Sequence, residues 1–133
     1  MVNGSCLCGS VRFALDSPPT MMVRCHCSRC RKAGASTFVF VSRASLRLLA
    51  GAECLVTYRP EPPFTFGRTF CGRCGTSFGE LEGEGDLLPI SADVLDDDPG
   101  VRIRFHEYVA DKPAWSVIGD DARQFPGDPR APA

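Results

Sequence analysis

The sequence Cys25-His26-Cys27-Ser28-Arg29-Cys30 decides how the rest of the chain is interpreted, because it places three thiols within six residues. The spacing, C-x-C-x-x-C, allows the three sulfurs to converge on one metal ion. Four thiolates close a tetrahedral zinc site, whereas three leave one coordination position free for chemistry. Whether a fourth protein ligand fills that position is the central question that this sequence raises.

The chain contains eight cysteines among 133 residues. Cysteines at this density form disulfides in secreted proteins and bind metals in cytosolic ones. Residues 1–5 show neither the basic nor the apolar segment of a signal peptide. We therefore expect a cytoplasmic protein whose thiols bind zinc, with iron as the weaker alternative.

Two further cysteine pairs, in residues 6–9 (CLCG) and 71–75 (CGRCG), have the spacing of zinc knuckles. Each pair ends in glycine, which lets the backbone turn tightly beneath a metal ion. A C-x-C pair combined with a C-x-x-C pair is a strong signal for a four-thiolate structural zinc site. The expected ligands of this first zinc ion are Cys6, Cys8, Cys71 and Cys74.

The three-cysteine cluster is expected to hold a second zinc ion, so we predict two per chain. Two interpretations of its fourth position stay open. In one, Cys54 is the fourth ligand and both sites are structural. In the other, Cys54 is a small core residue, and Cys25, Cys27 and Cys30 form an open catalytic site. Cys54 stands alone in a predicted strand, without a chelating neighbour, and this favours the open site.

Basic residues flank the three-cysteine cluster. Arg29, Arg31 and Lys32 are candidates to bind substrate carboxylates, although a solvated basic loop accounts for each of them singly just as well. The net charge of -1 gives no general reason to expect nucleic acid as a partner. No apolar run approaches the length of a membrane span. The oligomeric state is not predicted.

Short alternating or β-branched segments, bounded by glycine and proline, predict a mainly β, antiparallel fold with little helix. We expect one domain over residues 1–133, with about seven to nine short strands and a tail that frays from about residue 127. Residues 43–50 suit either a helical turn or a strand, and residues 28–34 a loop or one helical turn. The predicted strands are residues 11–15, 21–24, 36–41, 53–58, 64–70, 76–81, 87–91 and 102–109.

Three other residues each allow a structural and a functional interpretation. His26 lies between two predicted ligands, so we expect its side chain to point away from their metal. His106 falls on the polar face of a predicted strand, where a surface histidine is commoner than a proton carrier. Trp115 is expected in the core rather than beside a substrate.

The cysteine motifs, taken together, resemble the glutathione-dependent formaldehyde-activating enzyme (GFA) family, which includes the relatives of centromere protein V. Residues 4–9, 25–34 and 68–76 carry the resemblance, and residues 94–97 and 112–115 are similar to later motifs of the family. The resemblance implies a zinc-binding β-tent fold with one structural and one catalytic zinc. It assigns Cys6, Cys8, Cys71 and Cys74 to the structural site and Cys25, Cys27 and Cys30 to the catalytic one.

The resemblance also implies an activity. S-(hydroxymethyl)glutathione synthases of this family are carbon–sulfur lyases that join formaldehyde to the glutathione thiol. The family pattern has seven cysteines, so Cys54 is a departure from it. The alternative is a non-catalytic zinc module, or a glutathione carrier, that binds a protein or thiol partner. An open second site favours the enzyme, and a site closed by Cys54 favours the module.

Overall fold

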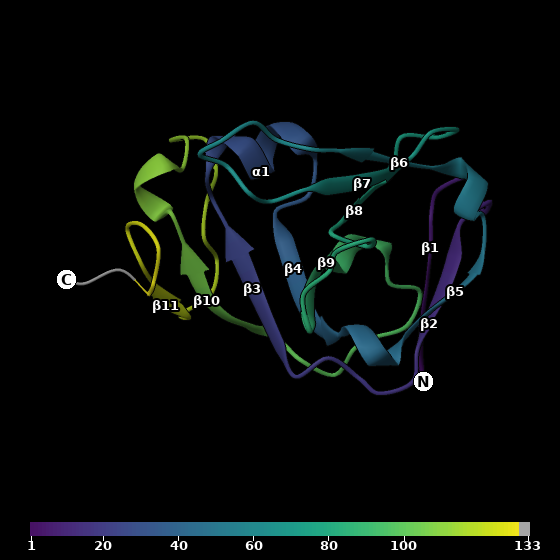
Figure 1. Cartoon of the computed structure of the whole chain (residues 1–133). Helices are drawn as coiled ribbons and strands as arrows, with labels where there is room; N and C mark the ends of the chain where they lie inside the picture. Colours follow the sequence, from purple (N-terminus) through teal and green to yellow (C-terminus); the bar gives the residue numbers. More distant parts are fainter. Residues whose placement is uncertain (131–133) are drawn as a thin grey trace.

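The computed structural model describes residues 1–130, and within them the fold is mainly β, as the sequence predicted (Figure 1). Its strands are β1 (Val2–Ser5), β2 (Arg12–Leu15), β3 (Met21–Cys25), β4 (Thr37–Ser42), β5 (Leu46–Ala50), β6 (Leu55–Tyr58), β7 (Arg68–Cys71), β8 (Ser77–Gly79), β9 (Leu87–Ser91), β10 (Ile103–Glu107) and β11 (Arg123–Gln124). One α-helix, α1 (Ser28–Ala33), and four 3₁₀ turns, η1 (Arg43–Ser45), η2 (Ala52–Cys54), η3 (Ala92–Val94) and η4 (Val109–Asp111), complete the described part.

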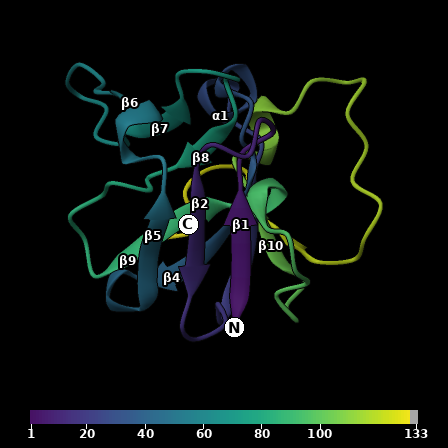
Figure 2. The ribbon, with the colours of Figure 1, turned by 90° about the vertical axis from the view of Figure 1, so that its right-hand side faces the viewer.

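The strands form two sheets. The smaller sheet has the order β1-β2-β5, and the larger has the order β11-β10-β3-β4-β9-β8-β7-β6. Figure 1 shows the small sheet at one end of the molecule and β10 and β11 at the opposite end. In the view of Figure 2 the three strands of the small sheet face the reader side by side. The helix α1 lies between the two ends, where β3 leads into it.

The main core lies between the small sheet and the middle of the large one. Phe13 of β2 and Phe78 of β8 are both fully buried, and their rings meet edge to face at 6.2 Å. Burial of a phenylalanine side chain contributes about 1.5–3 kcal/mol. Gly4 of β1 is required beside Phe13, because a Cβ at that position would lie 2.2 Å from the tip of the ring. This packing holds β1 and β2, and the cysteine loop between them, against the large sheet.

Two strand pairings depart from the antiparallel arrangement that we expected. β10 runs parallel to β3, with Glu107 opposite Cys25, and β11 runs parallel to β10. Adjacent strands joined by a tight turn must be antiparallel, whereas strands joined by a long connection are free to run parallel. About 80 residues separate β3 from β10, so local sequence does not set their relative direction.

The structure decides two segments for which the sequence allowed alternatives, and it corrects a third. Residues 43–50 contain both alternatives, a 3₁₀ turn followed by β5. Residues 28–33 form α1, and Gly34 caps its end with a left-handed φ of 79°. The predicted strand over residues 64–70 was wrong in its first half, because only β7 pairs with neighbours and Phe64 is exposed.

The chain after β10 folds back along that strand. The N–H of Tyr108 donates to the carbonyl of Gly127, and the N–H of Phe125 donates to the carbonyl of His106. Residues 131–133, part of the tail expected to fray, lie outside the described residues. Within residues 1–130, no helix combines the length and the apolar character needed to cross a membrane.

Candidate metal centres and adjoining pocket

The first cysteine cluster joins the two knuckles. Its members come from the loop after β1 and from the turn between β7 and β8, and their four sulfurs all lie within 4.8 Å of one another. The members are Cys6, Cys8, Cys71 and Cys74. Gly9 and Gly75 turn the backbone beneath the sulfurs with left-handed φ values of 78° and 80°. The cluster therefore connects the start of the chain to its middle.

The spacing of these sulfurs fits a zinc ion. A Zn–S bond of about 2.3 Å places tetrahedral sulfurs about 3.8 Å apart. The sulfurs of Cys6 and Cys8 are 3.5 Å apart, and those of Cys8 and Cys71 are 3.9 Å apart. The N–H of Val11 donates to the Cys6 sulfur over 3.3 Å, as backbone donors do around bound thiolates. The residues present are thus a suitable set of ligands for zinc.

Hydrogen bonds around the first cluster favour the thiolate form of some of its members. The hydroxyl and N–H of Thr76 lower the pKa of Cys74 to about 5. A hydrogen bond with Ser10 lowers the pKa of Cys8 as well. Burial acts in the opposite direction at Cys71 and raises its pKa to about 11. A cation bound by the four sulfurs would offset that cost of burial.

The second cluster lies where β3 meets α1. Cys25 is the last residue of β3, Cys27 is the N-cap of α1, and Cys30 faces inward from the helix. Their sulfurs also lie within 4.8 Å of one another. Cys25 and Cys30 are buried and Cys27 is half-buried, so one side of the cluster remains accessible.

The local structure concentrates negative charge on Cys27. Hydrogen bonds from the thiols of Cys25 and Cys30, together with the N–H of Cys30 at 3.3 Å, lower the pKa of Cys27 to about 2. The hydrogen bonds of the Cys25 thiol with Cys27 and Cys30, together with its burial, raise the pKa of Cys25 far above its usual range. Binding of a metal by all three sulfurs would therefore release protons.

Cys54 is not part of the second cluster. It ends η2 and packs against the main core, where the first cluster lies. Its carbonyl accepts a hydrogen bond of 2.7 Å from the N–H of Gly72, inside the second knuckle. Among residues 1–130, the second cluster comprises Cys25, Cys27 and Cys30 without a fourth cysteine, histidine or carboxylate ligand.

An arginine that we did not single out from the sequence contacts the second cluster. Arg68 of β7 is 8% exposed, and its Nη2 donates to the sulfur of Cys30 over 3.7 Å. Its guanidinium lies over the ring of Phe66, at 4.6 Å from the ring centre. Its Nη1 is buried without a hydrogen-bond partner among the described residues. Arg68 precedes Cys71 by three residues, but no local pattern indicates that it reaches another cysteine.

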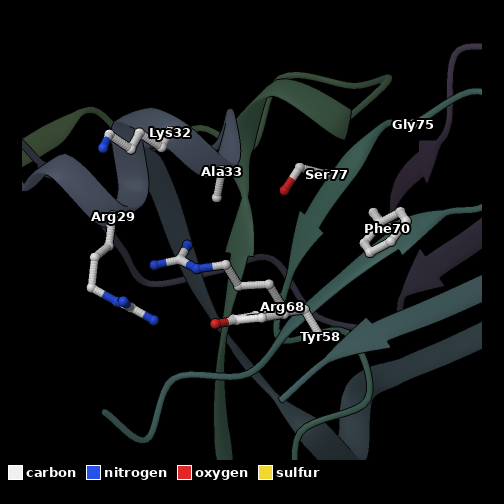
Figure 3. Close-up of a pocket in the computed structure, with 8 residues that line it drawn as sticks. All are labelled: Arg29, Lys32, Ala33, Tyr58, Arg68, Phe70, Gly75 and Ser77. Carbon is white, nitrogen blue, oxygen red and sulfur yellow. The ribbon is translucent and has the colours of Figure 1, made fainter. Parts of the chain in front are cut away.

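A pocket of about 440 Å³ adjoins this arginine (Figure 3). One wall is α1, and the other is formed by β6, β7 and the turn into β8, so the pocket lies between the elements that carry the two clusters. Figure 3 shows Arg68 extending from its strand toward the helix. The lining residues are Arg29, Lys32, Ala33, Tyr58, Arg68, Phe70, Gly75 and Ser77.

The pocket is positively charged. It is lined by three cationic side chains and no acidic one, and none of the three forms an ion pair with a carboxylate within residues 1–130. Arg29 also stacks on Phe64, with its guanidinium 3.8 Å from the ring centre. Burial raises the pKa of Glu80, and Arg68 partly opposes that shift, but Glu80 does not line this pocket.

The structure separates the three basic residues predicted to contact a substrate. Arg29 and Lys32 line the pocket, whereas Arg31 is exposed on α1 and does not line it. One turn of helix carries all three residues, but side chains at adjacent positions point in different directions.

Two predictions about single residues were wrong. His106 is 1% exposed instead of lying at the surface, because the chain after β10 covers it. Trp115 is 75% exposed instead of lying in the core. His26 is buried as well, and it turns toward His106, with the ring nitrogens 2.8 Å apart.

The fold and the two clusters define a class: a mainly β protein with one four-cysteine and one three-cysteine cluster beside a cationic pocket. The family model for the glutathione-dependent formaldehyde-activating enzyme matches residues 1–111. A Halomonas elongata protein, provisionally named a glutathione-dependent formaldehyde-activating enzyme, is 31% identical over 140 residues, which cover 97% of this chain and 89% of the relative. A crystal structure of a Rhodobacter sphaeroides protein is similar with a TM-score of 0.59 and 27% identity, over 75% of this chain and 90% of that one. The chain belongs to the glutathione-dependent formaldehyde-activating enzyme family.

Proposed function

We propose that this chain adds the thiol of glutathione to formaldehyde and so forms S-(hydroxymethyl)glutathione. The S–H bond of the thiol breaks, a bond forms between sulfur and the aldehyde carbon, and the proton ends on the former carbonyl oxygen. In the reverse direction the reaction is that of a carbon–sulfur lyase. The second cluster and the pocket beside it are the proposed active site.

The observation that carries this proposal is the cationic pocket joined to the three-cysteine cluster through Arg68. Glutathione has two carboxylates, and its thiol lies between them along the molecule. A pocket of about 440 Å³ falls within the range of about 300–1,000 Å³ that is typical for small-molecule sites. Unpaired cations beside a cluster of sulfurs suit a ligand that carries carboxylates and a thiol.

Within this proposal, Arg29 and Lys32 bind the carboxylates, and Arg68 adds positive charge while it holds the sulfur of Cys30. A substrate fixed in this way has its thiol and the aldehyde close together, which favours their reaction. When bound by Cys25, Cys27 and Cys30, a zinc ion supplies an open coordination position and a charge that favours the thiolate form of a substrate thiol. In the proposed assignment, Cys6, Cys8, Cys71 and Cys74 hold a structural zinc instead.

The position of Cys54 disfavours the alternative function, a non-catalytic module with two closed sites. That hypothesis required a fourth ligand at the second cluster, and Cys54 belongs to neither cluster and packs against the core beside the first one. A glutathione carrier uses the same pocket as the enzyme, so the two differ in turnover and not in binding.

The test combines binding with turnover. Calorimetry of the purified, reduced protein should show that glutathione binds, that S-methylglutathione binds more weakly, and that cysteamine, which lacks carboxylates, does not bind. Exchange NMR of labelled formaldehyde with glutathione should show faster interconversion in proportion to protein concentration. Binding without faster exchange would establish the carrier, and an absence of both would overturn the proposal.

A further inference from the structure

A chain of three polar side chains runs from the C-terminal segment to the second cluster, and the proposed reaction does not use it. Asp120 Oδ1 lies 2.9 Å from Nε2 of His106, and Nδ1 of His106 lies 2.8 Å from Nε2 of His26. Both histidines are buried, whereas the Asp120 side chain is 42% exposed. Asp120 lies beyond residues 1–111, the part matched by the family model.

The Asp120 carboxylate, at the end of this series of hydrogen-bonded side chains, determines which ring nitrogens carry a hydrogen. An ionised carboxylate only accepts hydrogen bonds, so Nε2 of His106 carries a hydrogen. When that ring is neutral, its Nδ1 is an acceptor, and Nε2 of His26 is then the donor to it. Each ring is thereby held in one tautomer and one orientation.

The position of His26 between Cys25 and Cys27 connects these hydrogen-bonded side chains to two thiols of the second cluster. Cys25 ends β3, and Cys27 has an extended backbone, with φ of -68° and ψ of 155°. Successive side chains of an extended segment point to opposite sides. The two cysteines accordingly meet Cys30 on one side, while the His26 ring meets His106 on the other.

Backbone hydrogen bonds hold Cys25 and His26 against neighbouring segments, and the His26 ring adds a side-chain contact to them. The N–H of Cys25 donates to Ser36 and the N–H of His26 donates to Glu107, so the segment is tied to both neighbours. The next residue, Cys27, is the N-cap of α1, where the chain leaves the sheet. The hydrogen bond with His106 holds the His26 ring and so limits rotation of residues 25–27 about the axis of the segment. The directions of the Cys25 and Cys27 thiols depend on that rotation.

We propose that Asp120 is a positioning residue, which acts through His106 and His26 to hold Cys25 and Cys27 in the geometry that binds a metal. The segment that carries Asp120 is itself fixed, because β11 pairs with β10 and Phe125 donates to the carbonyl of His106. The inference rests on metal binding by the second cluster, which is part of the proposed function.

The primary test compares Asp120→Ala with Asp121→Ala. Both residues are exposed and both variants lose one negative charge, but Asp121 takes no part in the chain of hydrogen bonds. Zinc release to a competing chelator, under reducing conditions, should occur in two phases, with the three-cysteine site releasing first. Loss of a residue that supports metal ligands typically weakens affinity about 10- to 100-fold. We expect Asp120→Ala to lower the zinc affinity of the three-cysteine site, measured in the first phase, by about tenfold. The affinity measured in the second phase should not change.

A second pair of variants tests the hydrogen bonds rather than the bulk of the side chain. Glutamine at position 106 can donate to Asp120 through its amide nitrogen and accept from His26 through its oxygen, whereas leucine can do neither. His106→Gln should therefore retain more of the zinc affinity of the three-cysteine site than His106→Leu does. Equal zinc affinities of the three-cysteine site in Asp120→Ala and Asp121→Ala would overturn the inference. An equal loss of zinc affinity at both sites in Asp120→Ala would overturn it as well.

Hydrogen exchange makes the test independent of metal content. In the purified protein, amides of residues 25–30 should exchange faster in Asp120→Ala than in the wild type or in Asp121→Ala. An unchanged exchange pattern would refute the positioning role even where the second cluster holds no zinc. Absence of zinc from the wild-type cluster, with the expected change in exchange, would instead count against the proposed function alone.

Discussion

Arg68 donates from Nη2 to the sulfur of Cys30 across 3.7 Å, although 38 residues separate the two in the sequence. The contact joins β7, which continues into the first cluster through Cys71, to α1, which carries part of the second. The guanidinium is almost wholly covered and lies over Phe66. One buried cation thus touches a candidate metal ligand and lines the pocket beside it.

Replacement of Arg68 by methionine removes a cation from the pocket and the hydrogen bond to Cys30. We expect it to weaken glutathione binding by about tenfold or more, since a charge-assisted hydrogen bond contributes about 1.5–3 kcal/mol. Arg68→Lys should restore only part of the loss, because lysine keeps the charge but lacks the planar fork. Calorimetry with reduced glutathione measures both effects. Wild-type affinity in the methionine variant would show that Arg68 has no role in binding.

Lys32 and Arg31 form a matched pair for the role of the pocket. They are neighbours on α1, both are exposed, and only Lys32 lines the pocket. Lys32→Met should weaken glutathione binding about three- to tenfold, for a contribution of about 0.7–1.4 kcal/mol. Arg31→Met removes the same charge and should change affinity less than twofold. Equal losses in the two variants would point to a general effect of charge and against the pocket.

The metal content of the protein should be two zinc ions per chain when it is purified under reducing conditions without chelators. Cys54→Ser should leave that content unchanged, because Cys54 belongs to neither cluster. Elemental analysis and thiol titration provide the measurement. A drop from two ions to one in Cys54→Ser would return this residue to the set of ligands.

The two clusters should differ in their contribution to stability. Cys74→Ser removes a proposed zinc ligand from the cluster that ties residues 6–8 to the β7–β8 turn, and structural zinc contributes on the order of 10 kcal/mol to folding. We expect that variant to be unfolded or insoluble. Cys27→Ser should stay folded, because its cluster closes a local loop and serine is itself a good N-cap for α1. Thermal melting followed by circular dichroism distinguishes them, and similar melting of the two variants would refute this division of roles.

Gly51 and Gly100 allow a test of the packing between the small sheet and the loop after β5. Both have left-handed φ values, 89° and 77°, so alanine at either site costs about 1–2 kcal/mol. At Gly51 the added Cβ would also lie 2.2 Å from the carbonyl oxygen of Ser10, whereas at Gly100 it would meet nothing within 4 Å. Urea unfolding should therefore show a clearly larger loss of stability for Gly51→Ala. Equal losses would mean that the backbone near Ser10 moves aside without cost.

Local features of this protein were determined by the sequence alone. The cysteines of each pair are two or three residues apart, and at that distance backbone geometry keeps their sulfurs close in almost any fold. Alternating segments such as residues 11–15 predicted β2 because a period of two depends on the strand itself. The mainly β class, the turns at Gly9 and Gly75 and the direction of His26 away from the neighbouring thiols follow from such short-range rules.

Only the tertiary structure decided which distant residues meet. Arg68 reaches Cys30 across 38 positions and His26 reaches His106 across 80, and no sequence pattern encodes either contact. The alternation that placed His106 on a polar face was real, but the returning C-terminal segment covers that face. The position of Cys54 was likewise set by a long-range pairing, since β6 pairs with β7 and Cys54, the residue before β6, therefore lies beside the second knuckle. Side-chain direction along one strand is a local property, whereas burial depends on which segment packs against it.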